Sequence, residues 1–227
     1  MRPIHAALAA LTLSASLPAC AQETDDSAAE AEMDAADAGE AEAITATGPD
    51  AATLGEADAP VTIVEYASTT CPHCANFHAT LFPHVKSEWI DTGRAKLVMR
   101  PLPTAPAELA AAGFLLARCA GDDRYFDVLD DLFETQDALF AALQDGELQT
   151  YFEDVAGENG IEAGQIEACM SDESGFEQIN ASIAAAQEDD VAGTPSFVID
   201  GALYSAGDLP SEAAWDEALQ TAYDARQ

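Results

Sequence analysis

The segment Cys-Pro-His-Cys at residues 71–74 lies where one kind of sequence pattern ends and another begins. Before it, a short apolar run at residues 61–64, bounded by Pro60 and Ser68, predicts a strand buried on both faces. After it, side chains recur at the spacing of one helical face: Cys74, Phe77, His78, Leu81, Val85 and Trp89. Two thiols at such a junction are compatible with a metal site, a structural disulfide or a redox centre.

The redox interpretation follows from the chemistry of a helix N-terminus. Pro72 suits the first helical position, because its missing N–H would be unpaired there. Cys71 then lies beside free backbone N–H groups and the positive end of the helix dipole, which lower the pKa of its thiol. His73 can add positive charge and a hydrogen bond to the Cys71 sulfur, and Cys74 is one turn further on the same side. A stabilised thiolate leaves readily, so the disulfide between the two cysteines would oxidise other thiols through a mixed disulfide.

A zinc site is the competing interpretation. It would use Cys71, Cys74, His78 and His84, which all fall on one predicted helix. Zinc modules separate two ligand pairs by a longer loop, and one rigid helix does not easily surround a tetrahedral ion. We therefore expect no metal ligands and no cofactor.

The remaining patterns predict an α/β fold with an inserted helical domain. A second strand is expected at residues 94–103, a hairpin at 196–206 around the turn Asp200–Gly201, and a final helix capped by Ser211. The span of about 104–188 between the strands reads as several helices. A strand, helix, strand order with a long helical insert implies a sheet with a crossover connection.

The N-terminus has the character of an export signal. Residues 1–19 carry Arg2 and an uncharged apolar stretch too short to span a bilayer, followed by Leu-Pro-Ala-Cys, which resembles the lipobox of bacterial lipoproteins. Cys20 is then the expected site of lipidation, although cleavage after residues 19–21, Ala-Cys-Ala, is an alternative. Residues 20–50 are rich in Ala, Asp and Glu, contain no Lys or Arg, and predict an extended tether. The folded domain is expected at residues 51–227.

Charge and compartment limit the partners. Eight basic against 42 acidic residues give a formal charge of −34, which excludes nucleic acid as an electrostatic partner. We expect a periplasmic monomer tethered to a membrane by its lipid. The cysteines would then meet an oxidising environment.

A second motif lies far downstream. In Gly-Thr-Pro-Ser-Phe-Val-Ile-Asp-Gly, at residues 193–201, Pro195 directly precedes a predicted strand. Together with Cys-Pro-His-Cys, this motif resembles the DsbA-like branch of the thioredoxin superfamily over residues 55–227. The resemblance implies a thioredoxin-like fold, a cis Pro195 beside the cysteines, and binding of an extended substrate by Thr194 and Pro195. Pro-His between the cysteines is typical of oxidising members, whereas a threonine at residue 194 also occurs in isomerase-type relatives.

Glu65 is the remaining catalytic candidate. It shares a strand face with Val61 and Ile63 in a run otherwise suited to the core, so its charge needs a reason. Its place six residues before Cys71 matches the buried acid of the family, which implies that it relays the proton of Cys74. A solvent-facing strand-end Glu is the alternative, and Lys96 is a candidate partner.

Cys119 and Cys169 both fall in the helical insert. In an oxidised chain we expect them to form a structural disulfide, as in some DsbA-like relatives, and closing that loop would contribute about 4 kcal/mol. Two unpaired buried thiols are the alternative.

The predicted function is a thiol–disulfide oxidoreductase that oxidises cysteine pairs of exported proteins. The resemblance also implies a quinone-linked membrane partner similar to DsbB that reoxidises the cysteines. A disulfide reductase or isomerase, and a redox-inactive peptide-binding chaperone module, are the alternatives.

Overall fold

The computed structural model describes residues 52–227. The predicted signal peptide, the tether and Cys20 lie outside this part of the chain. Among the described residues, no helix has the length and apolar character needed to cross a bilayer.

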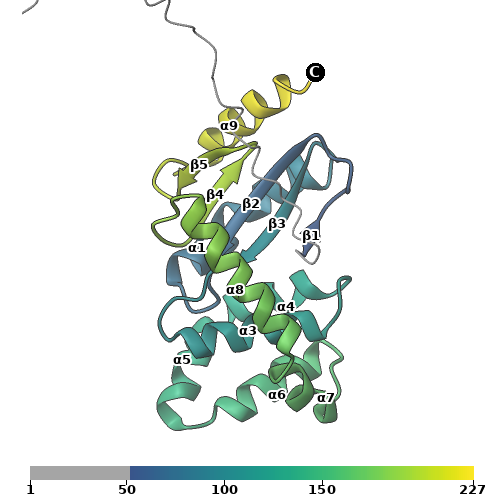
Figure 1. Cartoon of the computed structure of the whole chain (residues 1–227), viewed down its shortest axis with the longest axis vertical. Helices are drawn as coiled ribbons and strands as arrows, with labels where there is room; N and C mark the ends of the chain where they lie inside the picture. Colours follow the sequence, from purple (N-terminus) through teal and green to yellow (C-terminus); the bar gives the residue numbers. More distant parts are fainter. Residues whose placement is uncertain (1–51) are drawn as a thin grey trace, which may run out of the picture. The chain divides into compact units, whose positions relative to one another are not determined.

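A five-stranded mixed sheet forms the centre of the fold, with the order β1-β3-β2-β4-β5 (Figure 1). Strands β2 and β3 are parallel, while β1, β4 and β5 each run antiparallel to their neighbours. The strands are β1 Thr53–Leu54, β2 Val61–Ala67, β3 Ala95–Pro101, β4 Ser196–Ile199 and β5 Ala202–Ser205. Asp200 and Gly201 join the last two strands with φ angles of 48° and 88°. Positive φ at both positions is what a type I′ hairpin turn requires, and the predicted hairpin is confirmed.

The two faces of the sheet are covered by different helices. One face packs against α1 Pro72–Thr80 and α9 Glu212–Asp224, with Phe77 and Trp215 stacked between them. The other face carries Val64, Tyr66 and Val198 and is covered by Ala186 of α8. Because side chains alternate along β2, Glu65 faces the same side as Val61 and Ile63, towards α1. The chain leaves α1 through α2 Phe82–Val85 and the π-helical turn η1 Lys86–Ile90.

Six helices lie between β3 and β4. They are α3 Ala107–Cys119, α4 Tyr125–Glu134, α5 Gln136–Asp145, α6 Leu148–Glu158, α7 Ala163–Met170 and α8 Glu173–Glu188. In Figure 1, helices α3 to α7 lie together below the sheet, and α8 runs from this group back up to β4. The predicted α/β class, with helices inserted between the strands, agrees with this order of elements.

Candidate active site

Cys71 occupies the N-cap of α1, and Pro72 follows as the first helical residue. The Cys71 carbonyl accepts hydrogen bonds from the backbone N–H groups of Cys74 and Ala75, so the helix begins at the motif. Cys71 is 7% exposed and Cys74 is fully buried, whereas Pro72 and His73 face solvent. Both cysteines are buried, and Cys71 is the more accessible of the two.

The environment moves the pKa values of the two thiols in opposite directions. A hydrogen bond from the Cys74 thiol is the largest influence on Cys71 and, with donors from Thr194 and the backbone of residues 73 and 74, lowers its pKa to about 5. Burial raises the pKa of Cys74, and the Cys71 thiol and the charge of Glu65 raise it further. The contribution of His73 to the Cys71 thiolate comes through its backbone N–H, while its side chain is exposed.

The peptide bond between Thr194 and Pro195 is cis and lies beside Cys71. In the thiol form, Cys71 Sγ donates to the Thr194 carbonyl oxygen at 3.3 Å. The buried Thr194 hydroxyl has no hydrogen-bond partner among residues 52–227. It is therefore available as a donor when the thiol ionises, which agrees with its lowering of the Cys71 pKa.

Glu65 is fully buried, and its partner is His78. His78 Nε2 lies 3.1 Å and 3.2 Å from the two Glu65 carboxylate oxygens. The alternative of a solvent-facing Glu65 does not describe the structure. Lys96, the partner suggested by the sequence, instead donates to the carbonyl oxygen of Ala57 in an exposed position.

Comparison with known proteins places this arrangement in a family. The family model described as thioredoxin matches residues 46–221. The chain belongs to this thioredoxin family.

Curated relatives match part of this chain in sequence. A Rickettsia bellii protein named "Putative protein-disulfide oxidoreductase" is 34% identical over 174 residues, which are 74% of this chain and 64% of that protein. The chain spans between 52% and 64% of the length of this protein and of four other Rickettsia relatives.

Solved structures share the fold. Wolbachia pipientis alpha-DsbA1 superposes with a TM-score of 0.68 at 24% identity, covering 79% of this chain and 94% of that one. Oxidised BdbD from Bacillus subtilis gives a TM-score of 0.64 at 22% identity, covering 77% and 93%. The chain therefore shares the predicted thioredoxin-like fold with these DsbA-like structures.

Gln136 is a site residue that the sequence did not reveal. From the start of α5, its Nε2 donates to the carbonyl oxygens of Thr69 at 2.9 Å and Cys71 at 3.2 Å. The Thr69 hydroxyl in turn donates to the Ala110 carbonyl oxygen in α3. The inserted helices thus hold the loop that presents Cys71. Nothing in the sequence marks one Gln, 65 residues downstream, for this position.

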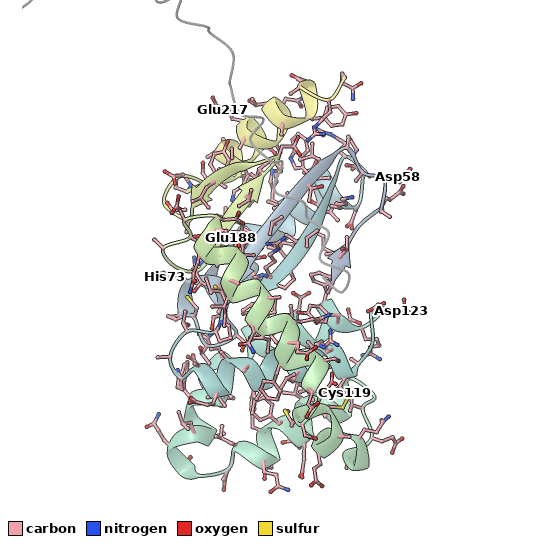
Figure 2. All side chains as sticks on the ribbon, viewed as in Figure 1. Asp58, His73, Cys119, Asp123, Glu188 and Glu217 are labelled. Carbon is pink, nitrogen blue, oxygen red and sulfur yellow. A yellow bond between two sulfur atoms is a disulfide. The ribbon has the colours of Figure 1, made fainter. Side chains whose placement is uncertain are left out.

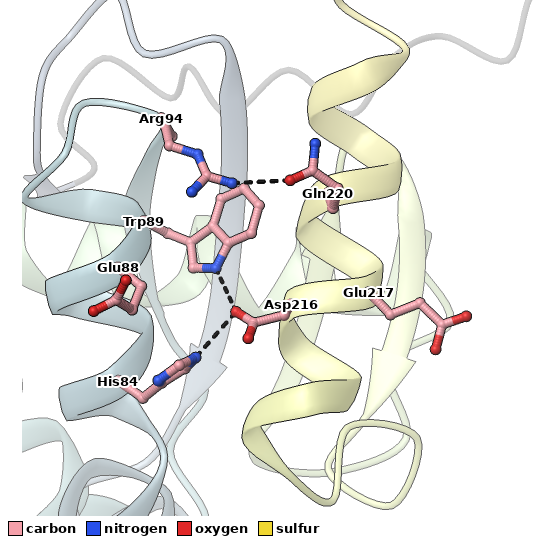
Figure 3. Close-up of a pocket in the computed structure, with 7 residues that line it drawn as sticks. All are labelled: His84, Glu88, Trp89, Arg94, Asp216, Glu217 and Gln220. Atoms are coloured by element: carbon pink, nitrogen blue, oxygen red, sulfur yellow. Dashed lines mark hydrogen bonds and ion pairs between the residues drawn. The ribbon is translucent and has the colours of Figure 1, made fainter.

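Two further groups lie apart from the thiols. A disulfide joins Cys119, at the end of α3, to Cys169 in α7, and Figure 2 labels Cys119 well away from His73. His84 lines a polar pocket, where its Nε2 lies 3.0 Å from Asp216 Oδ1 on α9 (Figure 3). The residues considered as zinc ligands therefore do not share one site. His78 contacts Glu65, whereas His84 contacts Asp216. Within residues 52–227, no group of three or more His, Cys, Asp or Glu side chains is arranged to hold a metal.

Proposed function

We propose that this chain is a thiol–disulfide oxidoreductase in which Cys71 exchanges with the substrate and Cys74 is its buried partner in the disulfide. The observation that carries the proposal is the opposite shift of their pKa values, with Cys71 at about 5 and Cys74 raised by burial. When the environment moves the pKa values of two neighbouring groups in opposite directions, the two groups typically have different roles in the same reaction.

The proposed reaction has two steps. A substrate thiolate attacks Cys71 Sγ, the bond between Cys71 and Cys74 breaks, and a mixed disulfide with Cys71 forms. A second substrate thiolate then attacks the substrate sulfur of that mixed disulfide, and Cys71 leaves as a thiolate. The substrate is oxidised to its disulfide, and the Cys71–Cys74 pair is reduced.

The proposed direction is oxidation of the substrate. At pH 7 a thiol with a pKa of about 5 is almost fully ionised, whereas an ordinary cysteine with a pKa of 9 is about 1% ionised. At pH 7 the difference is set by the two pKa units between 5 and 7. At about 1.36 kcal/mol per unit, it stabilises the reduced form by about 3 kcal/mol. That energy corresponds to a reduction potential about 60 mV more oxidising.

We further propose that the substrates are exported proteins with cysteine pairs, whose extended backbone binds beside Thr194 and Pro195. The signal-like residues 1–19 and the Cys119–Cys169 disulfide support an oxidising compartment such as the periplasm. Lipidation at Cys20 and reoxidation by a quinone-linked membrane protein similar to DsbB complete the proposal. Metabolic labelling with a fatty acid tests the anchor, because Cys20→Ala should remove the label and release the protein from membranes.

The decisive experiment combines a reduction potential with oxidation of a dithiol peptide. We expect a potential well above the about −270 mV of thioredoxin, and loss of peptide oxidation in Cys71→Ser. Cys74→Ser is the matched control: it has no Cys71–Cys74 disulfide to pass on and should not oxidise the peptide. Its Cys71 thiolate should still attack a peptide that carries a disulfide, and it should stop at the mixed disulfide. A potential near that of thioredoxin would overturn the oxidising direction. Failure of the wild-type chain to exchange disulfides would overturn the activity itself.

A further inference from the structure

The buried Glu65–His78 pair has a third member in the inserted helices. Asp130 of α4 places a carboxylate oxygen 3.5 Å from His78 Nδ1. This is an ion-pair distance, and Nδ1 makes no direct hydrogen bond within the described chain. The three side chains form a line from the fully buried Glu65, through His78, to Asp130, whose side chain is 53% exposed.

The surroundings of His78 favour a proton on its ring. Its imidazole stacks on Phe133 at 4.2 Å between ring centroids and contacts Phe82, so water does not surround it. The titratable groups that act on it are Glu65 from β2 and Asp130 from α4, and both are acidic. Burial opposes the charge, yet these two carboxylates raise the pKa of His78 to about 9. A buried carboxylate such as Glu65 needs a cationic partner, and His78 supplies it.

The resolved influence of this pair on the thiol site falls on Cys74. It precedes His78 by four residues on α1, a spacing that puts both side chains on one face of the helix. The negative charge of Glu65 acts on Cys74 and raises the pKa of its thiol. When the Cys71–Cys74 bond breaks, Cys74 receives the electron pair as a buried thiolate beside a buried carboxylate. Two adjacent anions in the core are costly, so this leaving group needs a proton at once.

We propose that His78 supplies the proton for Cys74 through Glu65, and that Asp130 of the inserted helices keeps His78 charged for this purpose. The inference rests on the proposed disulfide exchange. When a thiolate attacks Cys71, the disulfide electron pair passes to Cys74 Sγ. The Nε2 proton of His78 moves to Glu65, and the Glu65 proton moves to Cys74. The products are a mixed disulfide at Cys71, a Cys74 thiol, an ionised Glu65 and a neutral His78 with its remaining proton on Nδ1, facing Asp130.

The test is the pH dependence of the reduction of the Cys71–Cys74 disulfide by 2-mercaptoethanol, with each rate divided by the concentration of its thiolate. In the wild type we expect this corrected rate to fall as pH rises through about 9, where His78 loses its proton. His78→Gln keeps a donor to Glu65 but has no proton to transfer. Its corrected rate should be about 100-fold lower at pH 7 and flat across the same range.

Two further variants separate proton supply from packing. Asp130→Asn preserves shape and removes charge at a half-exposed position, so the break in the profile should move to lower pH. His84→Gln removes the other histidine with an aspartate contact, outside the thiol site, and should leave the profile unchanged. If His78→Gln keeps the wild-type rate and profile, the inference is overturned. That result is distinguishable from failure of the proposed function, because 2-mercaptoethanol reduces the disulfide whether or not the protein oxidises peptides.

Discussion

Replacing Cys74 with Ala removes the hydrogen bond that contributes most to the low pKa of Cys71. A hydrogen bond to a charged group is worth about 1.5–3 kcal/mol, which at about 1.36 kcal/mol per unit equals about 1–2 pKa units. The pKa of Cys71 should therefore rise from about 5 to between about 6 and 7. Cys74→Ser is the matched control, because its hydroxyl still donates and should hold the value near that of the wild type.

The measurement is the thiolate absorbance near 240 nm as a function of pH. At pH 5.5 the ionised fraction of Cys71 should fall from about three quarters in the reduced wild type to between about 3% and 25% in Cys74→Ala. Absorbance is preferable to alkylation rates, because a thiolate of higher pKa is intrinsically more nucleophilic and would hide part of the change. The Cys74 thiol does not interfere, since burial keeps it protonated throughout this range. An unchanged pKa in Cys74→Ala would refute the reasoning and assign the stabilisation to Thr194 and the backbone donors.

Three other predictions concern the surroundings of the site. Gln136→Leu removes both hydrogen bonds to the loop before α1 and should lower the free energy of unfolding by about 1–3 kcal/mol in urea titrations. Gly113→Ala should lower the free energy of unfolding by about 1–3 kcal/mol in the same titrations, because the added Cβ would lie 2.7 Å from Thr69 Oγ1. Gly157→Ala is the control: its Cβ would meet open space, and it should raise the free energy of unfolding by up to about 1 kcal/mol. The folded pKa of His78 is about 9 against an ordinary 6.5, so its stabilisation is complete below pH 6.5 and is lost as pH rises through 9. Oxidised protein should lose about 3 kcal/mol over that window, and His78→Gln should lose much less.

The cysteine motif could be predicted from the sequence because its determinants are local. The apolar run before it, Pro72 at the first helical position and the helical spacing after it all lie within about 30 residues. The same spacing placed His78 on the face of Cys74. It did not reveal the contact with Glu65, because that contact depends on how α1 crosses β2.

The rest of the site depends on contacts between distant segments. Gln136 reaches a loop 67 residues earlier in the chain, and the Asp130–His78 pair joins the inserted helices to α1. In the sequence both residues look like ordinary polar positions on amphipathic helices. Lys96 was the more obvious partner for Glu65 by charge, but it lies on the neighbouring strand with its ammonium group turned to the Ala57 carbonyl. Charge alone therefore suggested the wrong partner. Glu65 faces the side of the sheet that α1 covers, and its partner, His78, comes from that helix.

The low pKa of Cys71 does not require a cation, which matters in a chain of formal charge −34. The groups that lower it are the Cys74 thiol, Thr194 and backbone N–H groups, all of them uncharged donors. Solvent-exposed carboxylates more than about 10 Å away are largely screened at ordinary ionic strength, so they act weakly on this thiolate. A negative surface and a stable thiolate can therefore coexist. Inside the core, uncharged donors are not enough. The buried carboxylate of Glu65 needs a positive charge in direct contact, and the protonated ring of His78 supplies it.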